Sequence, residues 1–184
     1  MYFFYDKKNR LTDCIGLYSG GSDSEKNVFE WHKYIYDSKN RIVGDTTYGF
    51  LIYKSGSLTP LPPVDDDEIE FYSLSHYTLD SKDRIIKRTR TRYPDMRIDS
   101  ANYTYGQDGN LIVPNLHYDN NISFLRTHTI WMLLSFDYSV NNPFIASEYN
   151  SKGLPTNFGP NTPQYGNQFL YTTLKNMTIE YSCK

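Results

Sequence analysis

The stretch Tyr36-Asp37-Ser38-Lys39-Asn40-Arg41-Ile42 has the side chains that a tight hairpin turn needs. Asn at its fifth position tolerates the left-handed backbone of a three-residue hairpin loop. Asp at its second position can accept hydrogen bonds from the backbone amides that follow, and it faces the Arg at the sixth position across the two strands. The stretch therefore predicts the tip of an antiparallel hairpin whose register an Asp-Arg pair helps to fix.

Four further segments align with this stretch without gaps, and their fifth position is always Asn, Asp or Gly. They are the ranges 5–11, 79–85, 105–111 and 149–155. The spacing between successive tips varies along the chain, which favours a meander of hairpins over a regular solenoid. The predicted turn residues are Asp6, Asn9, Arg10, Asp37, Asn40, Arg41, Asp80, Asp83, Arg84, Gly109 and Gly153.

Tyrosine is the unusual component of the composition, with 18 copies beside 10 phenylalanines in 184 residues. It suits a half-exposed sheet face, because the ring packs on its neighbours while the hydroxyl reaches water. Together with the repeated turn, this composition predicts an all-β fold. We expect an antiparallel meander of about five or more hairpins that forms a curled sheet or a partly closed barrel, in a single domain over residues 1–184.

Segments rich in aromatic or β-branched residues flank the predicted turns. Residues 130–134 are apolar throughout, so we expect them to form the best buried strand. Residues 28–36 favour a strand, although the capping-box spacing of Ser22 and Glu25 leaves a short helix over residues 24–32 as the alternative. The other predicted strands are residues 48–53, 69–79, 85–93, 98–105, 127–138 and 176–181.

Charge and hydropathy limit the classes of partner. The net charge of -2 gives no global attraction to nucleic acid or to an anionic membrane. No run of 18 apolar residues is present, so no transmembrane helix is expected. No basic-then-apolar leader precedes Tyr2, so either the protein stays in the cytoplasm or it is exported and the leader is absent from this chain.

Cys14 and Cys183 lie near opposite ends of the chain. Two buried free thiols are the favoured interpretation, since unpaired cysteine is commonly buried, and a disulfide is the alternative. A disulfide between Cys14 and Cys183 would make the first and last hairpins neighbours and would close the sheet on itself.

The chain contains no recognisable pattern for catalysis or metal binding. A nucleophile motif such as G-x-S-x-G is absent. The four histidines lack the spacing of metal ligands and are interpreted as hydrogen-bonded strand residues, while the acidic run at residues 65–68 lacks the alternation and glycine of a calcium loop. We therefore expect no catalytic residues, no metal and no cofactor.

Arg88, Arg90 and Arg92 share one face of the strand that follows the third turn, with Lys87 on the other face. Positive charges at intervals of about 6.6 Å could follow a phosphate or sulfate polymer. We favour the alternative that they lie on an exposed edge strand, deter edge-to-edge association and meet Glu68 or Glu70, because the whole chain is not basic.

Aromatic side chains supply the second set of candidate binding residues. Rings exposed on a sheet could stack on sugar rings. Tyrosine-rich strands also pack on one another across a sheet, and we favour this structural role. The candidates are Trp31, Tyr34, Tyr36, Tyr103, Tyr105 and Tyr118.

The Tyr-Asp-x-x-Asn/Gly-Arg-Leu/Ile hairpin resembles the YD repeats of RHS-type bacterial surface and toxin-delivery proteins. Residues 136–143, 149–155 and 177–181 are similar to stretches of uncharacterised envelope proteins and lipoproteins of Gram-negative bacteria, in which such hairpins form a curled, porin-like antiparallel sheet. The chain departs from the YD pattern at Leu79, Gly106 and Asn150. The resemblance implies an exported protein, located in the periplasm, at the outer-membrane surface or outside the cell, and it supplies no catalytic residues.

The residues and the resemblance together leave three hypotheses for the function. The first is a non-enzymatic β-sheet protein of the bacterial envelope that binds a glycan or a protein partner, or that has a structural part. The second is a carbohydrate-acting hydrolase with two carboxylates drawn from separate hairpins. The third is a polyanion-binding module that uses Arg88, Arg90 and Arg92. Nucleic acid is not an expected partner, and the sequence does not indicate an oligomeric state.

Overall fold

The computed structural model describes residues 1–17, 25–54, 57–60, 72–114, 116–159 and 176–182. By its internal contacts the chain divides into two compact units, Met1–Asn102 and Tyr103–Lys184, and each unit is described by itself. The expectation of a single domain over residues 1–184 stays a prediction.

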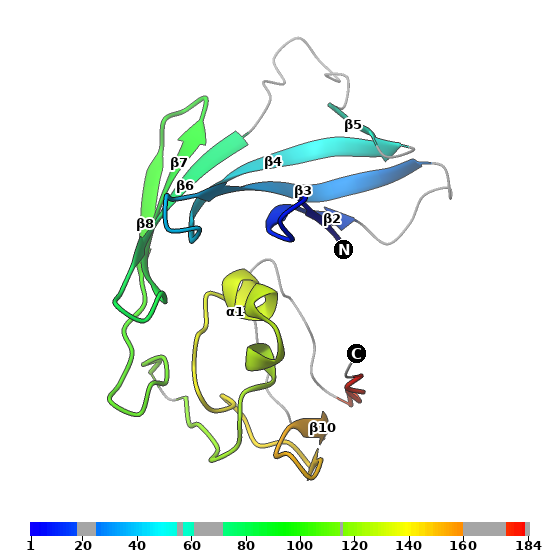
Figure 1. Ribbon diagram of the computed structural model, residues 1–184. Coiled ribbons are helices and arrows are strands. Elements are labelled where there is room, and N and C mark those ends of the chain that lie inside the picture. Colours follow the sequence, from blue (N-terminus) through cyan, green and yellow to red (C-terminus); the bar gives the residue numbers. More distant parts are fainter. Residues whose placement is uncertain (18–24, 55–56, 61–71, 115, 160–175, 183–184) are drawn as a thin grey trace. The chain divides into compact units, whose positions relative to one another are not determined.

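The first unit is an open antiparallel sheet of eight strands (Figure 1). Seven strands follow one another in the order β1-β2-β3-β4-β6-β7-β8, and β5 pairs with β4. The sheet curls but does not close, which confirms the predicted all-β meander of hairpins in its curled form. The strands are β1 (Tyr2–Tyr5), β2 (Leu11–Leu17), β3 (Glu25–Tyr36), β4 (Ile42–Lys54), β5 (Ser57–Pro60), β6 (Tyr72–Leu79), β7 (Ile85–Tyr93) and β8 (Ile98–Asn102).

All five predicted tips adopt one turn geometry. In the second tip, the Asp37 amide donates to the Arg41 carbonyl oxygen at 3.0 Å and the Asn40 amide donates to the Asp37 carbonyl oxygen at 3.0 Å. The other four tips repeat both backbone hydrogen bonds. The fifth residue has a positive φ in every tip, with values of 57° at Asn9, 65° at Asn40, 59° at Asp83, 84° at Gly109 and 74° at Gly153.

In the first three tips the second and sixth residues form the expected ion pair. Arg10 Nη2 lies 2.7 Å from Asp6 Oδ2, and the corresponding distances are 2.8 Å for Arg41 and Asp37 and 2.7 Å for Arg84 and Asp80. Each of these aspartates also accepts hydrogen bonds from two backbone amides of its own turn. The side chain thus caps the loop and pairs across the strands at once.

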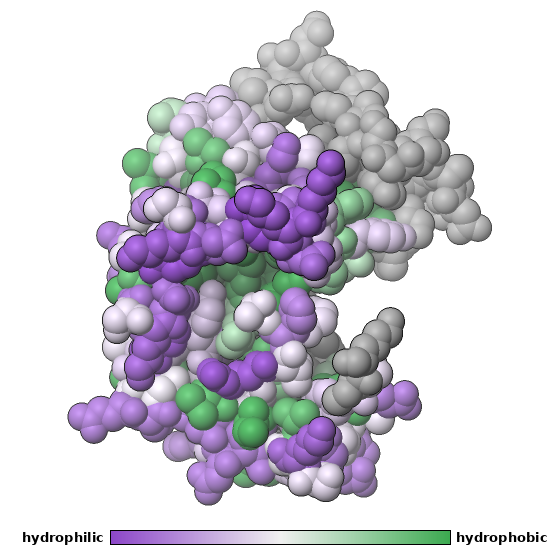
Figure 2. Space-filling view, in the orientation of Figure 1, coloured by the Kyte–Doolittle hydropathy of each residue, from purple (hydrophilic) through white to green (hydrophobic). Residues whose placement is uncertain are grey.

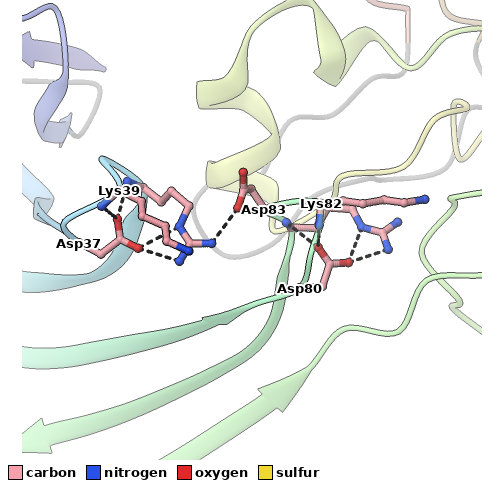
Figure 3. A network of polar contacts seen from close by, with 7 residues as sticks. Asp37, Lys39, Asp80, Lys82 and Asp83 are labelled. Atoms are coloured by element: carbon pink, nitrogen blue, oxygen red, sulfur yellow. Dashed lines mark hydrogen bonds and ion pairs between the residues drawn. The ribbon is translucent and has the colours of Figure 1, made fainter.

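Neighbouring tips are linked to one another at the ends of their strands. Arg41 Nη1 donates to Asp83 Oδ1 at 2.8 Å, which joins the second tip to the third (Figure 3). Arg10 Nη1 makes the equivalent bond to Asn40 Oδ1 at 3.0 Å. The arginine of one tip therefore binds the side chain of the positive-φ residue in the next tip. The residues that shape each turn also link neighbouring hairpins.

The strand register gives the sheet two faces of different chemistry. Trp31 pairs with Tyr48 on one face, and His32 pairs with Thr47 on the other. On β6, Ser73, Ser75 and Tyr77 are buried whereas the intervening residues are exposed. We call the face of His32 the charged face and the face of Trp31 the aromatic face.

Among its described residues, the second unit contains little regular structure. A 3-10 helix η1 (Phe124–Thr127) precedes a short helix α1 (Thr129–Ser135), and strands β9 (Glu148–Tyr149) and β10 (Pro155–Asn157) form a two-stranded sheet around the fifth tip. Phe144, Ala146 and Phe158 form a buried hydrophobic cluster in this unit, with Phe124 packed against it. The fourth tip closes with a single bridge between Tyr105 and Leu111.

The strand predicted over residues 127–138 is wrong, because residues 129–135 form α1. Ile130, Leu133 and Leu134 are its buried residues, and their spacing is that of one helical face. His128 caps the helix by accepting a hydrogen bond from the Ile130 amide. Phe136 ends it in the left-handed conformation, with φ of 51°. An apolar run such as residues 130–134 is compatible with a buried strand, but its capping and helical spacing produce a short helix.

The other strand predictions have mixed outcomes. The strand over residues 28–36 is confirmed within β3, and that over residues 85–93 coincides with β7. The strand over residues 98–105 ends at Asn102. The segment 176–181 is not a strand and forms one bridge, between Asn157 and Thr178, beside β10. Residues 69–71 lie outside the described residues, and β6 begins at Tyr72.

Cys14 is fully buried on β2. Burial raises the pKa of its thiol to about 12. Cys183 lies outside the described residues, so the Cys14–Cys183 disulfide stays a prediction. None of the helices in the described ranges is long and apolar enough to span a membrane.

Candidate functional site

Two rows of paired residues organise the charged face. The first row runs across five strands through Cys14, His32, Thr47, Ser73 and Arg92. The adjacent row contains Tyr34, Asp45, Ser75, Arg90 and Asp99. Because neighbouring strands lie about 4.8 Å apart, residues in one row or in adjacent rows can contact one another directly. The register therefore gathers two charged clusters on one sheet face.

The first cluster is centred on His32. Its Nδ1 lies 2.7 Å from Asp45 Oδ2, and its Nε2 lies 3.1 Å from Glu30 Oε2. Asp45 is 1% exposed and also accepts hydrogen bonds from the hydroxyls of Thr47 and Tyr77. A buried carboxylate with this set of donors is fully engaged, so it fixes the position of the imidazole ring.

The electrostatics of this cluster favour a charged histidine. Burial of His32 opposes its protonation, but the hydrogen bonds and charges of Asp45 and Glu30 outweigh burial and raise the pKa of His32 to about 9. Burial works against the Asp45 carboxylate as well, but His32, Thr47 and Tyr77 stabilise the charged form and lower the pKa of Asp45. The cluster thus holds a cation between two carboxylates at neutral pH.

The second cluster joins the three predicted arginines to one aspartate. Arg90 Nη2 and Arg92 Nη2 each lie 3.0 Å from Asp99 Oδ2, and Arg88 Nη2 lies 4.0 Å from Asp99 Oδ1. Burial opposes ionisation of Asp99, but the hydrogen bonds and charges of Arg90 and Arg92 lower its pKa. The three residues that the sequence predicts on one strand face are therefore brought together. We call Arg88, Arg90, Arg92 and Asp99 the arginine cluster.

The arginine cluster does not lie on an edge strand. β7 is an inner strand, paired with β6 on one side and with β8 on the other. The expectation that these charges protect an exposed edge is therefore wrong. Asp99, on β8, supplies the acidic partner. Glu68 and Glu70, the partners expected from the sequence, lie outside the described residues.

The aromatic face carries a continuous row of rings over four adjacent strands. The ring centroids are 5.1 Å apart for Trp31 and Tyr48, 6.2 Å for Tyr48 and Tyr72, and 4.5 Å for Tyr72 and Tyr93. All four side chains are partly exposed. The Trp31 indole Nε1 donates to Asp13 Oδ1 at 2.9 Å, which fixes the first ring. We call Trp31, Tyr48, Tyr72 and Tyr93 the aromatic row.

Polar residues lie directly beside the aromatic row. The next row on the same face contains Asp13, Lys33, Thr46, Leu74 and Thr91. The Lys33 ammonium lies 5.0 Å from the Trp31 ring centroid, within range of a cation–π contact. Figure 2 shows hydrophilic and hydrophobic residues interspersed on the described surface in that view.

The other aromatic candidates from the sequence do not join this row. Tyr34 belongs to the charged face, and the Tyr36 hydroxyl donates to the Leu11 carbonyl oxygen at 2.9 Å. In the second unit, Tyr103 stacks on Phe136, the Tyr105 hydroxyl accepts from the Tyr138 amide, and the Tyr118 hydroxyl donates to the Leu111 carbonyl oxygen. These contacts are structural.

The described part of the chain has no group of three His, Cys, Asp or Glu side chains arranged to hold a metal ion. Where a described Asp has a shifted pKa, the shift is downward. A general acid in a glycosidase needs a raised pKa instead.

Comparisons of the chain with protein-family models, with curated proteins and with solved structures return no match. The candidate sites therefore depend on the geometry and chemistry of this chain alone.

Proposed function

We propose that the protein is a non-enzymatic binding protein of the bacterial envelope that holds a carbohydrate on its aromatic row. The observation that carries this proposal is the alignment of Trp31, Tyr48, Tyr72 and Tyr93 across four strands. A rigid sheet holds these rings in place, so binding would require little ordering of side chains.

The chemistry of the face fits a neutral sugar chain. Sugar rings have apolar faces of C–H groups and a rim of hydroxyls. The aromatic row offers apolar area together with tyrosine hydroxyls, which can donate and accept hydrogen bonds. Asp13, Lys33 and Thr46 in the adjacent row supply further polar groups for sugar hydroxyls.

The described carboxylates favour binding over hydrolysis. Glu30 and Asp45 come from two neighbouring strands, and both are bound to His32. The lowered pKa of Asp45 keeps it ionised, whereas a retaining or inverting glycosidase needs one protonated carboxyl. The hydrolase alternative stays a prediction, and hydrolysis products from a bound oligosaccharide would support it.

Export is supported by the resemblance of the hairpins to those of bacterial envelope proteins. The test is protease treatment of intact bacterial cells that produce the protein from its complete gene. We expect degradation by added protease in intact cells or after release of the periplasm, together with survival of a cytoplasmic marker. Export would be contradicted if the protein, like the cytoplasmic marker, stayed intact after protease treatment of intact cells and again after release of the periplasm.

Calorimetric titration with neutral hexasaccharides tests carbohydrate binding. The panel contains β-1,4-linked glucose, β-1,4-linked N-acetylglucosamine, α-1,4-linked glucose and α-1,6-linked mannose. We expect saturable binding of at least one of them, weakened at least about tenfold by Trp31→Ala, as for an interface hot spot.

Tyr5→Ala is the matched control, since Tyr5 is 49% exposed and lies on β1 outside the aromatic row. This variant should bind as the wild type does. Equal loss of affinity in Trp31→Ala and Tyr5→Ala, or no binding by any hexasaccharide, would contradict the proposal.

A further inference from the structure

We propose that the three hairpin tips of the first unit form a binding edge for an anionic membrane surface. The tips join β1 to β2, β3 to β4 and β6 to β7, so they lie side by side at one end of the sheet. We call residues 6–10, 37–41 and 80–84 the tip edge. The proposal is independent of carbohydrate binding on the aromatic row and adds a second partner, negatively charged lipid headgroups.

Contacts between the tips make the edge one continuous structure. Arg10 Nη1 donates to Asn40 Oδ1 at 3.0 Å, and Arg41 Nη1 donates to Asp83 Oδ1 at 2.8 Å. Figure 3 shows the second of these links, between the second and third tips. Neighbouring tips are two strands apart, or about 10 Å. The three loops therefore present their outer residues together and at regular intervals.

Lysine occupies the fourth position of each of these three tips. The backbone amides of Lys8, Lys39 and Lys82 donate to the capping aspartate of their own turn at 2.8 to 2.9 Å, so the turn fixes where each side chain leaves the loop. Lys7 adds a fourth lysine in the first tip, and all four residues are exposed. In the described part of the chain, none of these four ammonium groups forms an ion pair.

The tip edge is positively charged on a chain that is slightly acidic. Its three loops contain seven basic and four acidic side chains, an excess of three positive charges, whereas the whole chain has a net charge of -2. All four aspartates are bound to arginines of the tips, which leaves the lysines for an outside partner. Charges farther away than about 8 Å are screened at physiological salt, so the local excess governs contact with a surface.

The described residues that flank the acidic run 65–68 lie far from the tip edge. Pro60 pairs with Leu51, and Tyr72 pairs with Tyr48. Tyr48 is six residues along β4 from the start of that strand at the tip, or about 20 Å in an extended strand. The described strand ends on both sides of the acidic run are therefore well separated from the lysines.

The arrangement suits a surface of many headgroups better than one compact anion. From the first tip to the third the lysines spread over about 20 Å, too far to enclose a single phosphate group. Lysine is a flexible and strongly hydrated point charge, and each lysine can meet a separate headgroup. Tyr5, beside the first tip, is 49% exposed, and tyrosine is common at the level of membrane headgroups.

Co-sedimentation of the full chain with lipid vesicles tests the proposal. One set of vesicles contains phosphatidylcholine alone, and the other contains about one third phosphatidylglycerol. At about 0.15 M salt we expect at least about tenfold tighter binding to the phosphatidylglycerol vesicles, and loss of this preference in about 1 M sodium chloride. Equal binding to both kinds of vesicle, or binding to neither, would overturn the proposal.

The variant Lys39→Gln with Lys82→Gln removes two charges from the tip edge and keeps the backbone amides that the capping aspartates bind. We expect its partition coefficient onto phosphatidylglycerol vesicles to fall at least about tenfold. Arg97→Gln with Lys152→Gln is the matched control, because it removes the same charge from two exposed residues outside the tip edge. Arg97 lies between β7 and β8 at the other end of the sheet, and Lys152 has the fourth position of the fifth tip.

The control variant should bind as the wild type does, and circular dichroism should show that both variants are folded. An equal loss of vesicle binding in the two variants would overturn the proposal, since only the overall charge would then matter. Binding of a heparin hexasaccharide without binding of phosphatidylglycerol vesicles would also overturn it and would indicate a soluble polyanion as the partner.

Discussion

The two faces of the first-unit sheet are built from alternate residues of the same strands, yet they differ in what holds them together. On the aromatic face, Trp31, Tyr48, Tyr72 and Tyr93 contact one another through rings. On the charged face, His32 and Asp45 form a buried ion pair at 2.7 Å. Ring packing is independent of pH and nearly independent of salt, whereas the ion pair depends on protonation.

A step of one residue along a strand therefore separates ring packing on one face from ion pairing on the other. Residues 31 and 32 of β3 belong to different faces: Trp31 pairs with Tyr48, whereas the His32 side chain bonds to Asp45, both on β4. A shift of one residue in the pairing of β3 with β4 would place charges among rings on both faces. The Asp-Arg tip between β3 and β4 stabilises the correct register.

Asp45→Asn should have the largest effect on stability. It removes the buried negative charge that His32 faces while it keeps the size of the side chain. Removal of one partner from a buried pair leaves the other uncompensated, so we expect the free energy of unfolding in urea to fall by about 3 kcal/mol or more. Asp13→Asn, the same change on the aromatic face, should cost less than about 1 kcal/mol because an oxygen remains to accept from Trp31. Equal losses of unfolding free energy in Asp45→Asn and Asp13→Asn would show that the two faces do not differ in their dependence on buried charge.

The pH dependence of stability should come next in size. The pKa of His32 is raised from 6.5 to about 9 in the folded protein. Its contribution is complete below pH 6.5 and is lost as the pH rises through 9, so the free energy of unfolding should fall across this range. The loss should be about 3 kcal/mol, since a tenfold change in proton affinity corresponds to about 1.4 kcal/mol. His32→Gln should show a flatter profile in the same urea titrations, and an identical slope in both proteins would contradict a charged His32.

Tyr72→Ala should lower stability by an intermediate amount that does not vary with pH. Tyr72 contacts a ring on each side, and aromatic pairs contribute about 0.5–1.5 kcal/mol each, so we expect a loss of about 2 kcal/mol. Urea unfolding at pH 6 and at pH 9 should give the same difference from the wild type. A difference that changes with pH would indicate that the aromatic row is coupled to the His32 cluster.

Arg41→Lys should have the smallest effect, because it alters a tip at the strand ends and neither face. Lysine keeps the charge but cannot reproduce the bonds to Asp37 and Asp83 together. Both groups are near solvent, so we expect the melting temperature to fall by no more than about 2 °C. A much larger decrease would show that the links between tips, and not the faces, hold the sheet together.

The hairpin tips could be predicted from the sequence because their structure is local. Seven consecutive residues contain the left-handed residue, the capping side chain and the ion pair, as in Asp80, Asp83 and Arg84. The same local signals gave the all-β meander. Helix α1 was missed although Ile130, Leu133 and Leu134 have helical spacing, because a short apolar run is compatible with both a buried strand and a helix.

The candidate sites were predicted only where they lie on one strand. Arg88, Arg90 and Arg92 share β7, so their alternation was enough to place them together. Of the four residues in the aromatic row, the sequence indicates only Trp31 as a candidate. The contacts of the row with Tyr48, Tyr72 and Tyr93 depend on the register of four strands. The sequence indicates only an ordinary strand histidine at His32, because its contact with Asp45 depends on the same register. The nearby residue in the sequence that could indicate a charged His32 is Glu30, two residues away on the same face.

The most direct test of carbohydrate binding on the aromatic row is two-dimensional NMR of ¹⁵N-labelled protein during titration with the best-binding hexasaccharide. The chain has two tryptophans, and their indole N–H signals report on Trp31 in the aromatic row and on Trp131 in α1. We expect the Trp31 signal to shift in a saturable way while the Trp131 signal stays in place. A shift of Trp131 without Trp31, or no shift of either at saturating sugar, would contradict it.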